Sequence, residues 1–154
     1  MIAVAIIGLV AAFAGPAMQD MISNNKVVSK ANDIATALSF ARTEAIRRGE
    51  RVSMAPIDGE NWARGIHLGM SNDFESNKLK GGAEPLRTIT SSNHRYQMTV
   101  AASHVEFNGR GFIESTFTIE LCDNTSSKLE EGRIITVEGT GKVSVEELSC
   151  KEDS

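Results

Sequence analysis

The chain has 154 residues, enough for one ordinary domain, and a formal net charge of -4 at pH 7. This acidic balance gives no general basic field, so the totals do not favour nucleic-acid binding. Hydrophobic residues make up 41% of the chain and aromatic residues 5%, which fits a modest globular core and excludes a disordered chain.

The first segment carries no charged side chain from Met1 to Gln19. Its length approaches the roughly 20 apolar residues that a helix needs to cross a hydrocarbon core. It is rich in alanine and glycine, and such small residues let helices approach closely in lipid or in the core of a filament. We therefore expect residues 1–22 to form a helix half that lies in a membrane or in a filament core. The side chains assigned to the membrane or filament surface of this helix half are Ile2, Ile6, Ile7, Leu9, Val10, Phe13 and Pro16.

Two simpler interpretations of this segment stay open. One is a cleaved secretory signal with Ala12–Ala14 as the cleavage motif, although the basic region of such signals is missing. The other is a plain single-pass anchor. Neither predicts the amphipathic helix that follows without a linker.

That amphipathic helix is predicted from residue 23 to about residue 48. Six apolar residues follow one another at steps of 4, 3, 4, 3 and 4, which places them on one stripe that we expect to pack on a sheet. They are Val27, Ala31, Ile34, Leu38, Ala41 and Ala45. The polar residues near its end are Arg42, Glu44, Arg47 and Arg48. We interpret them as a solvated face, with contacts to a neighbouring subunit as the alternative.

The two helical segments should form one long, bent helix. Pro16, beside Gly15, would kink this helix rather than end it. Gly49 follows the last predicted turn and is a natural C-cap.

Beyond the helix the hydrophobic pattern changes to period two. The expected strands are Arg51–Ala55, Gly65–Leu68, Leu86–Thr90, Gln97–Val100, Val105–Phe107, Thr116–Leu121, Arg133–Val137 and Lys142–Val145. Segments 71–84 and 123–132 are predicted to be surface loops. Short strands with no helical pattern between them favour an antiparallel sheet. The fold class is therefore α+β, with one long N-terminal helix on a mostly antiparallel β-sheet and a single globular domain over residues 23–154.

Cys122 and Cys150 are the two cysteines of the chain, and they do not form a CxxC pair. In an exported domain such a pair predicts one disulfide, closing a loop of about 30 residues. Two buried free thiols in a cytosolic protein are the alternative.

The sequence gives no pattern for a catalytic, metal or cofactor site. It contains no Gly-x-Ser-x-Gly, HExxH or P-loop motif. The histidines His67, His94 and His104 lie far from both cysteines and are interpreted as surface or strand residues. Trp62 is interpreted as an anchor of the core or sheet edge. We expect a protein that is not an enzyme and needs no cofactor.

Several segments together resemble one known family. The run MIAVAIIGLVAAFAGPAM resembles the N-terminal helix of type IV pilins and type II secretion pseudopilins, often with a proline where Pro16 stands. The segment ANDIATALSFARTEAIRRGERVSM closely resembles the GspH/FimT branch of minor pilins. The same holds for Trp62–Gly65, for Phe107–Gly111 and for RIITVEGTGKVS. The family's basic leader, cleavage site and following glutamate are not found, so we expect a misplaced start codon or a clipped sequence.

This resemblance implies a structural role. It implies a minor pseudopilin or pilin of a type II secretion system or type IV pilus, which assembles through its N-terminal helix and helps to initiate or cap the filament. The implied location is the bacterial inner membrane, crossed once, with the globular domain in the periplasm. The implied partners are other pseudopilin or pilin subunits and the inner membrane, with secreted cargo as a further candidate.

A FimT-like minor pilin that binds DNA for uptake is the alternative function. That motif resembles G-R-x-R, and the matching residues 141–144 read G-K-V-S, so one cation replaces two arginines. Arg133 and Lys142 are the candidate DNA contacts, with Arg95 and Arg110 as further candidates. The nearby carboxylates Glu146, Glu147, Glu152 and Asp153 would repel phosphates. Nucleic acid is therefore not the expected partner.

Overall fold

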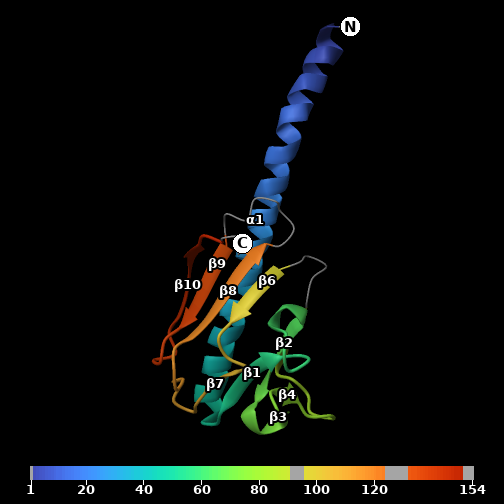
Figure 1. The fold of residues 1–154 in the computed structure, drawn as a ribbon. Coiled ribbons are helices and arrows are strands. Elements are labelled where there is room, and N and C mark those ends of the chain that lie inside the picture. The colour runs from blue at the N-terminus through green and yellow to red at the C-terminus, as the bar shows by residue number, and fades with distance from the viewer. Residues whose placement is uncertain (1, 91–95, 124–131, 151–154) are drawn as a thin grey trace.

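The computed structural model describes residues 2–90, 96–123 and 132–150, with the side chains of residues 2–23 outside that description. Helix α1 (Ile2–Arg48) is the longest element, and its 47 residues extend over about 70 Å. The helix runs without interruption through Pro16. Figure 1 shows its first half projecting away from the rest of the domain.

Gly49 ends α1. Its φ of 69° lies in the left-handed region, which a glycine adopts without steric cost. Its N–H donates a hydrogen bond to the carbonyl oxygen of Ala45 at 2.9 Å, as in an αL C-cap. Arg47 and Arg48 occupy the last turn, where the helix dipole favours positive charge.

In the described part of the chain ten strands follow, and eight of them form two antiparallel four-stranded sheets. The first sheet has the order β5-β2-β1-β7. Its strands are β5 (Arg87–Thr90), β2 (Gly65–Met70), β1 (Val52–Pro56) and β7 (Val105–Phe107). The second sheet has the order β10-β9-β8-β6. Its strands are β10 (Val143–Leu148), β9 (Gly132–Val137), β8 (Phe117–Asp123) and β6 (Tyr96–Val100).

Two expectations for the loops need correction. Segment 71–84 is more ordered than predicted, because a 3-10 turn (Ser71–Asp73) leads into the two-stranded hairpin of β3 (Phe74–Glu75) and β4 (Lys78–Leu79). Ser76 and Asn77 close that hairpin with φ angles of 50° and 62°, as in a type I′ turn. Asp123 and Gly132 belong to strands, and the remaining part of the second predicted loop, 124–131, lies outside the described residues.

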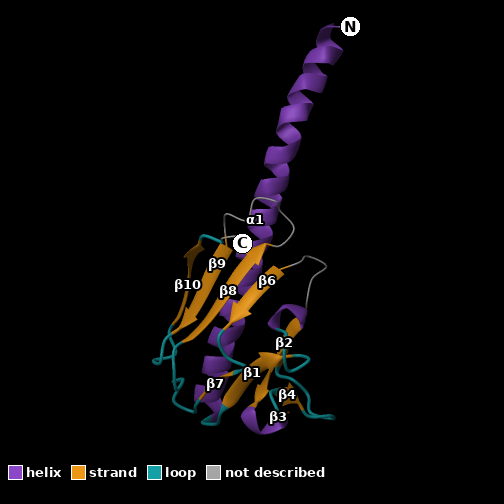
Figure 2. Cartoon of the chain, viewed as in Figure 1, coloured by secondary structure: helices purple, strands orange, loops and turns teal. Residues whose placement is uncertain are grey.

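The core lies where α1 meets both sheets. Figure 2 shows the second sheet beside the middle of the helix and the first sheet beside its C-terminal end. Strand β8 alternates buried and half-buried residues along all seven positions, because one of its faces covers the helix. The α+β expectation is thus confirmed, although the strands divide into two main sheets rather than one.

Candidate assembly site

The second half of α1 is held by the globular domain along one face. All six residues of the predicted apolar stripe, from Val27 to Ala45, have 0% exposed surface. Ala37 was not part of the predicted stripe, but it is buried as well. The face packs against strands of both sheets, above all β9, β1, β10 and β8. This half of the helix is therefore part of the domain core.

None of the described strands lies beside the first half of α1 (Figure 2). The seven residues assigned to a membrane or filament surface, from Ile2 to Pro16, lie on this projecting half. Their side chains lie outside the description, so the assigned contacts stay a prediction. Within the side chains that the structure describes, no helix is both long and apolar enough to cross a membrane.

Arg42 joins α1 to two separate turns. Its Nε donates to the carbonyl oxygen of Gly111 at 3.2 Å, and its Nη2 donates to that of Thr140 at 3.1 Å. The prediction of a solvated face was wrong for this residue, because its guanidinium satisfies backbone carbonyls of the domain. Sequence spacing gives no signal for such a contact, since its partners lie 69 and 98 residues further along the chain.

Glycines allow these turns to approach the helix. A Cβ at Gly141 would overlap the carbonyl oxygen of Gly111 and would lie 2.8 Å from the Nε of Arg42. A Cβ at Gly109 would lie 2.5 Å from the carbonyl oxygen of Gly49. Asn108 supports the first turn, because its Oδ1 accepts the backbone N–H of Arg110 at 2.9 Å. Three sequence segments that carry the family resemblance thus meet at one place.

Glu44 is also not solvated as predicted, since its side chain is largely buried. Its carboxylate accepts hydrogen bonds from Arg47 at 2.6 and 3.1 Å and from Arg48 at 2.8 Å. The hydrogen bonds from Arg47, and then those from Arg48, lower the pKa of Glu44 to about 2. This cluster neutralises one carboxylate and leaves a net positive charge at the end of α1.

A disulfide between Cys122 and Cys150 ties the end of β8 to the segment after β10. The two cysteines are 28 residues apart in sequence, and their Cα atoms are 6.1 Å apart. Gly132 lies beside the sulfurs, and a Cβ there would overlap Cys150 Sγ. The disulfide alternative is the one that the structure contains, and among the described residues no cysteine is free.

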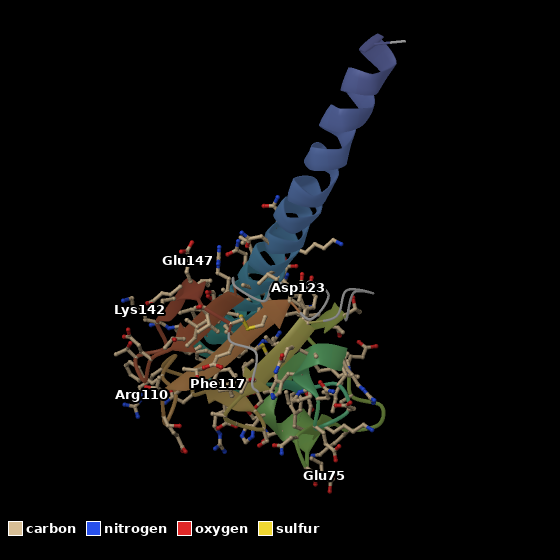
Figure 3. All side chains as sticks on the ribbon, turned by 45° about the horizontal axis from the view of Figure 1, so that its top comes forward. Glu75, Arg110, Phe117, Asp123, Lys142 and Glu147 are labelled. Carbon is tan, nitrogen blue, oxygen red and sulfur yellow. A yellow bond between two sulfur atoms is a disulfide. The ribbon has the colours of Figure 1, made fainter. Side chains whose placement is uncertain are left out.

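The two candidate DNA contacts are each close to a carboxylate. The Nη2 of Arg133 lies 3.6 Å from Glu147, and the arginine side chain is only 14% exposed. The Nζ of Lys142 lies 3.7 Å from Glu138. Figure 3 shows Arg110 and Lys142 on one side of the domain, with Glu147 further along the same side. Arg95 lies outside the described residues. Among the candidates that the structure describes, Glu138 and Glu147 interrupt the positive charge.

Trp62 and His67 make contacts within the domain. Trp62 packs against Phe117 with ring centroids 5.6 Å apart, and its indole N–H donates to the carbonyl of Ala102 at 3.2 Å. His67 lies on β2, where burial lowers its pKa and Nδ1 lies 3.0 Å from Thr88 Oγ1. His94, which was also interpreted as a surface or strand residue, lies outside the described residues. Within the described part of the chain, no three histidine, cysteine or carboxylate side chains are placed to hold a metal ion.

A projecting helix half, followed by a half that is covered by antiparallel sheets, defines the class of pilin-like subunits. The chain belongs to the GspH family of type II transport proteins, whose family model matches residues 30–141. This match includes Arg42 and both turns that contact it. The membership confirms the family resemblance found in the sequence.

Solved structures show the same fold. The type IV minor pilin FimU of Pseudomonas aeruginosa is similar with a TM-score of 0.65 and 21% identity, over 79% of this chain and 89% of FimU. The minor pseudopilin EpsH of the type 2 secretion system of Vibrio cholerae is similar with a TM-score of 0.56 and 14% identity, over 80% of this chain and 96% of EpsH. No curated protein sequence matches the chain closely.

Proposed function

We propose that this chain is a structural minor pseudopilin or minor pilin that assembles through the first half of α1. The division of that helix is the observation that carries the proposal. Its second half has its apolar face filled by the chain's own sheets, whereas its first half projects beyond them (Figure 1). The first 19 residues are uncharged and rich in small residues, so they suit lipid or neighbouring helices as surroundings.

The proposal places the first half of α1 in the bacterial inner membrane and the sheets in the periplasm. The disulfide between Cys122 and Cys150 supports this, because such bonds persist in oxidising compartments. A reporter enzyme that is active only in the periplasm, fused after Ser154 in the native gene, tests the orientation. Activity is expected, and an inactive but stable fusion protein would reject the orientation.

Crosslinking tests assembly through the helix. A photo-reactive amino acid at Leu9 should crosslink the chain to other pilin-like subunits of the same cell, because this residue lies on the projecting half. The same amino acid at Glu75 is the control, because Figure 3 places Glu75 at the end of the domain furthest from that half. Equal crosslinking to pilin-like subunits at both positions would contradict assembly through the helix.

We infer further that the chain initiates or caps the filament. Membership in the GspH family and likeness to two minor subunits support this role. A gold or fluorescent label on Lys142, which is exposed, should then mark filaments at one end and not along their length. Labels spaced along the whole filament would reject this role. Secreted cargo is a further proposed partner, and crosslinks from Glu75 to a protein that is not a pilin-like subunit would detect it.

A further inference from the structure

A polar groove lies between α1 and the outer strand of the first sheet. Its volume is about 400 Å³. Helix α1 contributes Lys26, Lys30 and Asp33, strand β5 contributes Arg87 and Thr90, and strand β6 contributes Tyr96. We refer to this set of residues as the α1–β5 groove. Three of its side chains are cationic and one is a carboxylate, so the groove carries a net positive charge in a chain whose net charge is -4.

Lys30 is the buried cation of the groove, with 8% of its surface exposed. Its Nζ donates to the carbonyl oxygen of Thr90 at 3.0 Å, which uses one of the three hydrogens of the ammonium group. Burial lowers the pKa of Lys30, and the nearby charge of Asp33 partly opposes this shift. A buried ammonium is costly without compensation, so a bound anion would stabilise the charged form.

Two other elements complete the site. Arg87 and Ile89 lie on the same face of β5, and Ile89 packs on the core, so the arginine side chain shares the face toward the helix. The hydroxyl of Tyr96 donates to the carbonyl of Lys26 at 3.4 Å, which fixes the tyrosine across the groove. An arginine beside two lysines suits a phosphate, because a guanidinium can donate two parallel hydrogen bonds to it.

The groove lies next to the apolar half of the helix. Lys26 is four residues beyond residue 22, or about 6 Å along the helix axis. The headgroup region on each side of a bilayer is about 5–7 Å thick. If the apolar half spans the hydrocarbon core, Lys26 therefore lies at headgroup depth and can extend its ammonium toward the lipid, whereas Lys30 lies about 12 Å beyond residue 22.

We propose that the α1–β5 groove binds the phosphate of an anionic phospholipid headgroup. This inference rests on the proposed insertion of α1 in the membrane. It assigns the groove a role while the subunit is in the bilayer: one anionic lipid offsets part of the net positive charge of the groove and fixes the angle at which the domain stands on the membrane. Free phosphate has the same chemistry, so the test must separate the two sources.

Tyr96 is the single tyrosine of the chain, which allows a site-specific probe. The full chain, labelled with 3-fluorotyrosine in neutral detergent, is titrated with dihexanoyl phosphatidylglycerol while its ¹⁹F resonance is recorded. A saturable shift is expected with phosphatidylglycerol, and an affinity at least tenfold weaker with dihexanoyl phosphatidylcholine or inorganic phosphate. Equal affinity for the two lipids, or inorganic phosphate binding as tightly as phosphatidylglycerol, would overturn the proposal.

Charge-removing variants locate the binding. The double variant Lys26→Gln/Arg87→Gln should weaken phosphatidylglycerol binding at least tenfold. The matched control Arg110→Gln/Lys142→Gln removes one arginine and one lysine outside the groove and should leave the affinity within twofold. The fluorescence of the buried Trp62 verifies that each variant is folded. If the double variant does not fold, the single variant Lys26→Gln, at an exposed position, repeats the test. Equal losses in both double variants would refute the groove.

Flotation of the full chain with phosphatidylcholine vesicles separates this inference from the proposed function. A chain that floats with these vesicles but shows no preference for phosphatidylglycerol refutes the groove and leaves membrane insertion intact. A chain that does not float refutes insertion, and the groove proposal falls with it.

Discussion

Truncation of Ile34 to alanine measures how firmly the domain holds α1. The side chain of Ile34 is completely buried between the helix and the sheets. Removing a buried isoleucine side chain down to Cβ costs about 2–5 kcal/mol, because transfer energy is lost and a cavity remains. Taking about 3 kcal/mol and a urea dependence of about 2 kcal/mol/M, we expect the unfolding midpoint to fall by about 1.5 M urea.

The same substitution at Ile46 is the matched control. Ile46 lies on the same helix but is 51% exposed, so its truncation should cost about 0.5–1 kcal/mol and shift the midpoint by less than about 0.5 M. The gain in helix propensity from isoleucine to alanine is the same at both positions and cancels in the comparison. The difference between the two unfolding midpoints therefore reports the packing of the helix on the sheets.

The single tryptophan provides the assay. Trp62 is buried and packs against Phe117, so its fluorescence reports unfolding of the sheets rather than fraying of the helix. Urea titrations of the full chain and both variants in neutral detergent give the midpoints. Equal midpoints for Ile34→Ala and Ile46→Ala would refute the conclusion that the second half of α1 is a part of the domain core.

Three further predictions concern the loops and the charged cluster. Replacing both Cys122 and Cys150 by alanine should cost about 3–4 kcal/mol in the same urea titration, because the loop they close spans 28 residues; an unchanged midpoint would contradict this. Gly141→Ala should destabilise the domain by about 2 kcal/mol or more, because its φ is +77° and the new Cβ overlaps a neighbouring carbonyl. Gly81→Ala is the matched control, because nothing lies within 4 Å of its new Cβ, and its stability should be nearly unchanged. Equal stability of the two variants would contradict the prediction. The pKa of Glu44 is lowered to about 2 in the fold, so the ion cluster stabilises the fold at pH values above the unfolded pKa of about 4.5 and loses this effect as pH falls toward 2. Glu44→Gln should therefore unfold more easily than the wild type at pH 6 but differ less at pH 2.5 in thermal melts, and a constant difference would exclude this ion cluster as the cause.

The sequence was most informative where a single period governs the structure. The stripe from Val27 to Ala45 predicted a helix face, because burial against sheets demands apolar residues every three or four positions. The eight expected strands all correspond to strands of the structure, with ends that differ by a few residues. The hairpin over 74–79 was missed, because its strands have only two residues each and cannot display a period.

Long-range polar contacts were not predictable in the same way. Lys30 lies beside the apolar stripe, but its hydrogen-bond partner is the backbone of Thr90, 60 residues away. Arg42 likewise reaches two turns whose positions depend on the complete fold. The family resemblance included those turns without explaining them. Their glycines are required because helix and turns approach more closely than a Cβ allows.

The division between the two halves of α1 gives the strongest argument for assembly. A helix that is apolar on one side needs one covering surface, and the second half has it within the chain. A helix without a charged residue over its first 19 positions has no polar side to offer water. Figure 2 shows no strand of the described residues beside that half, which favours surroundings supplied from outside the chain. In the proposed function, lipid surrounds this half before assembly and neighbouring helices surround it afterwards, and a helix rich in small residues suits both environments. The exchange between these two environments is the step that would move a subunit from the membrane into a filament.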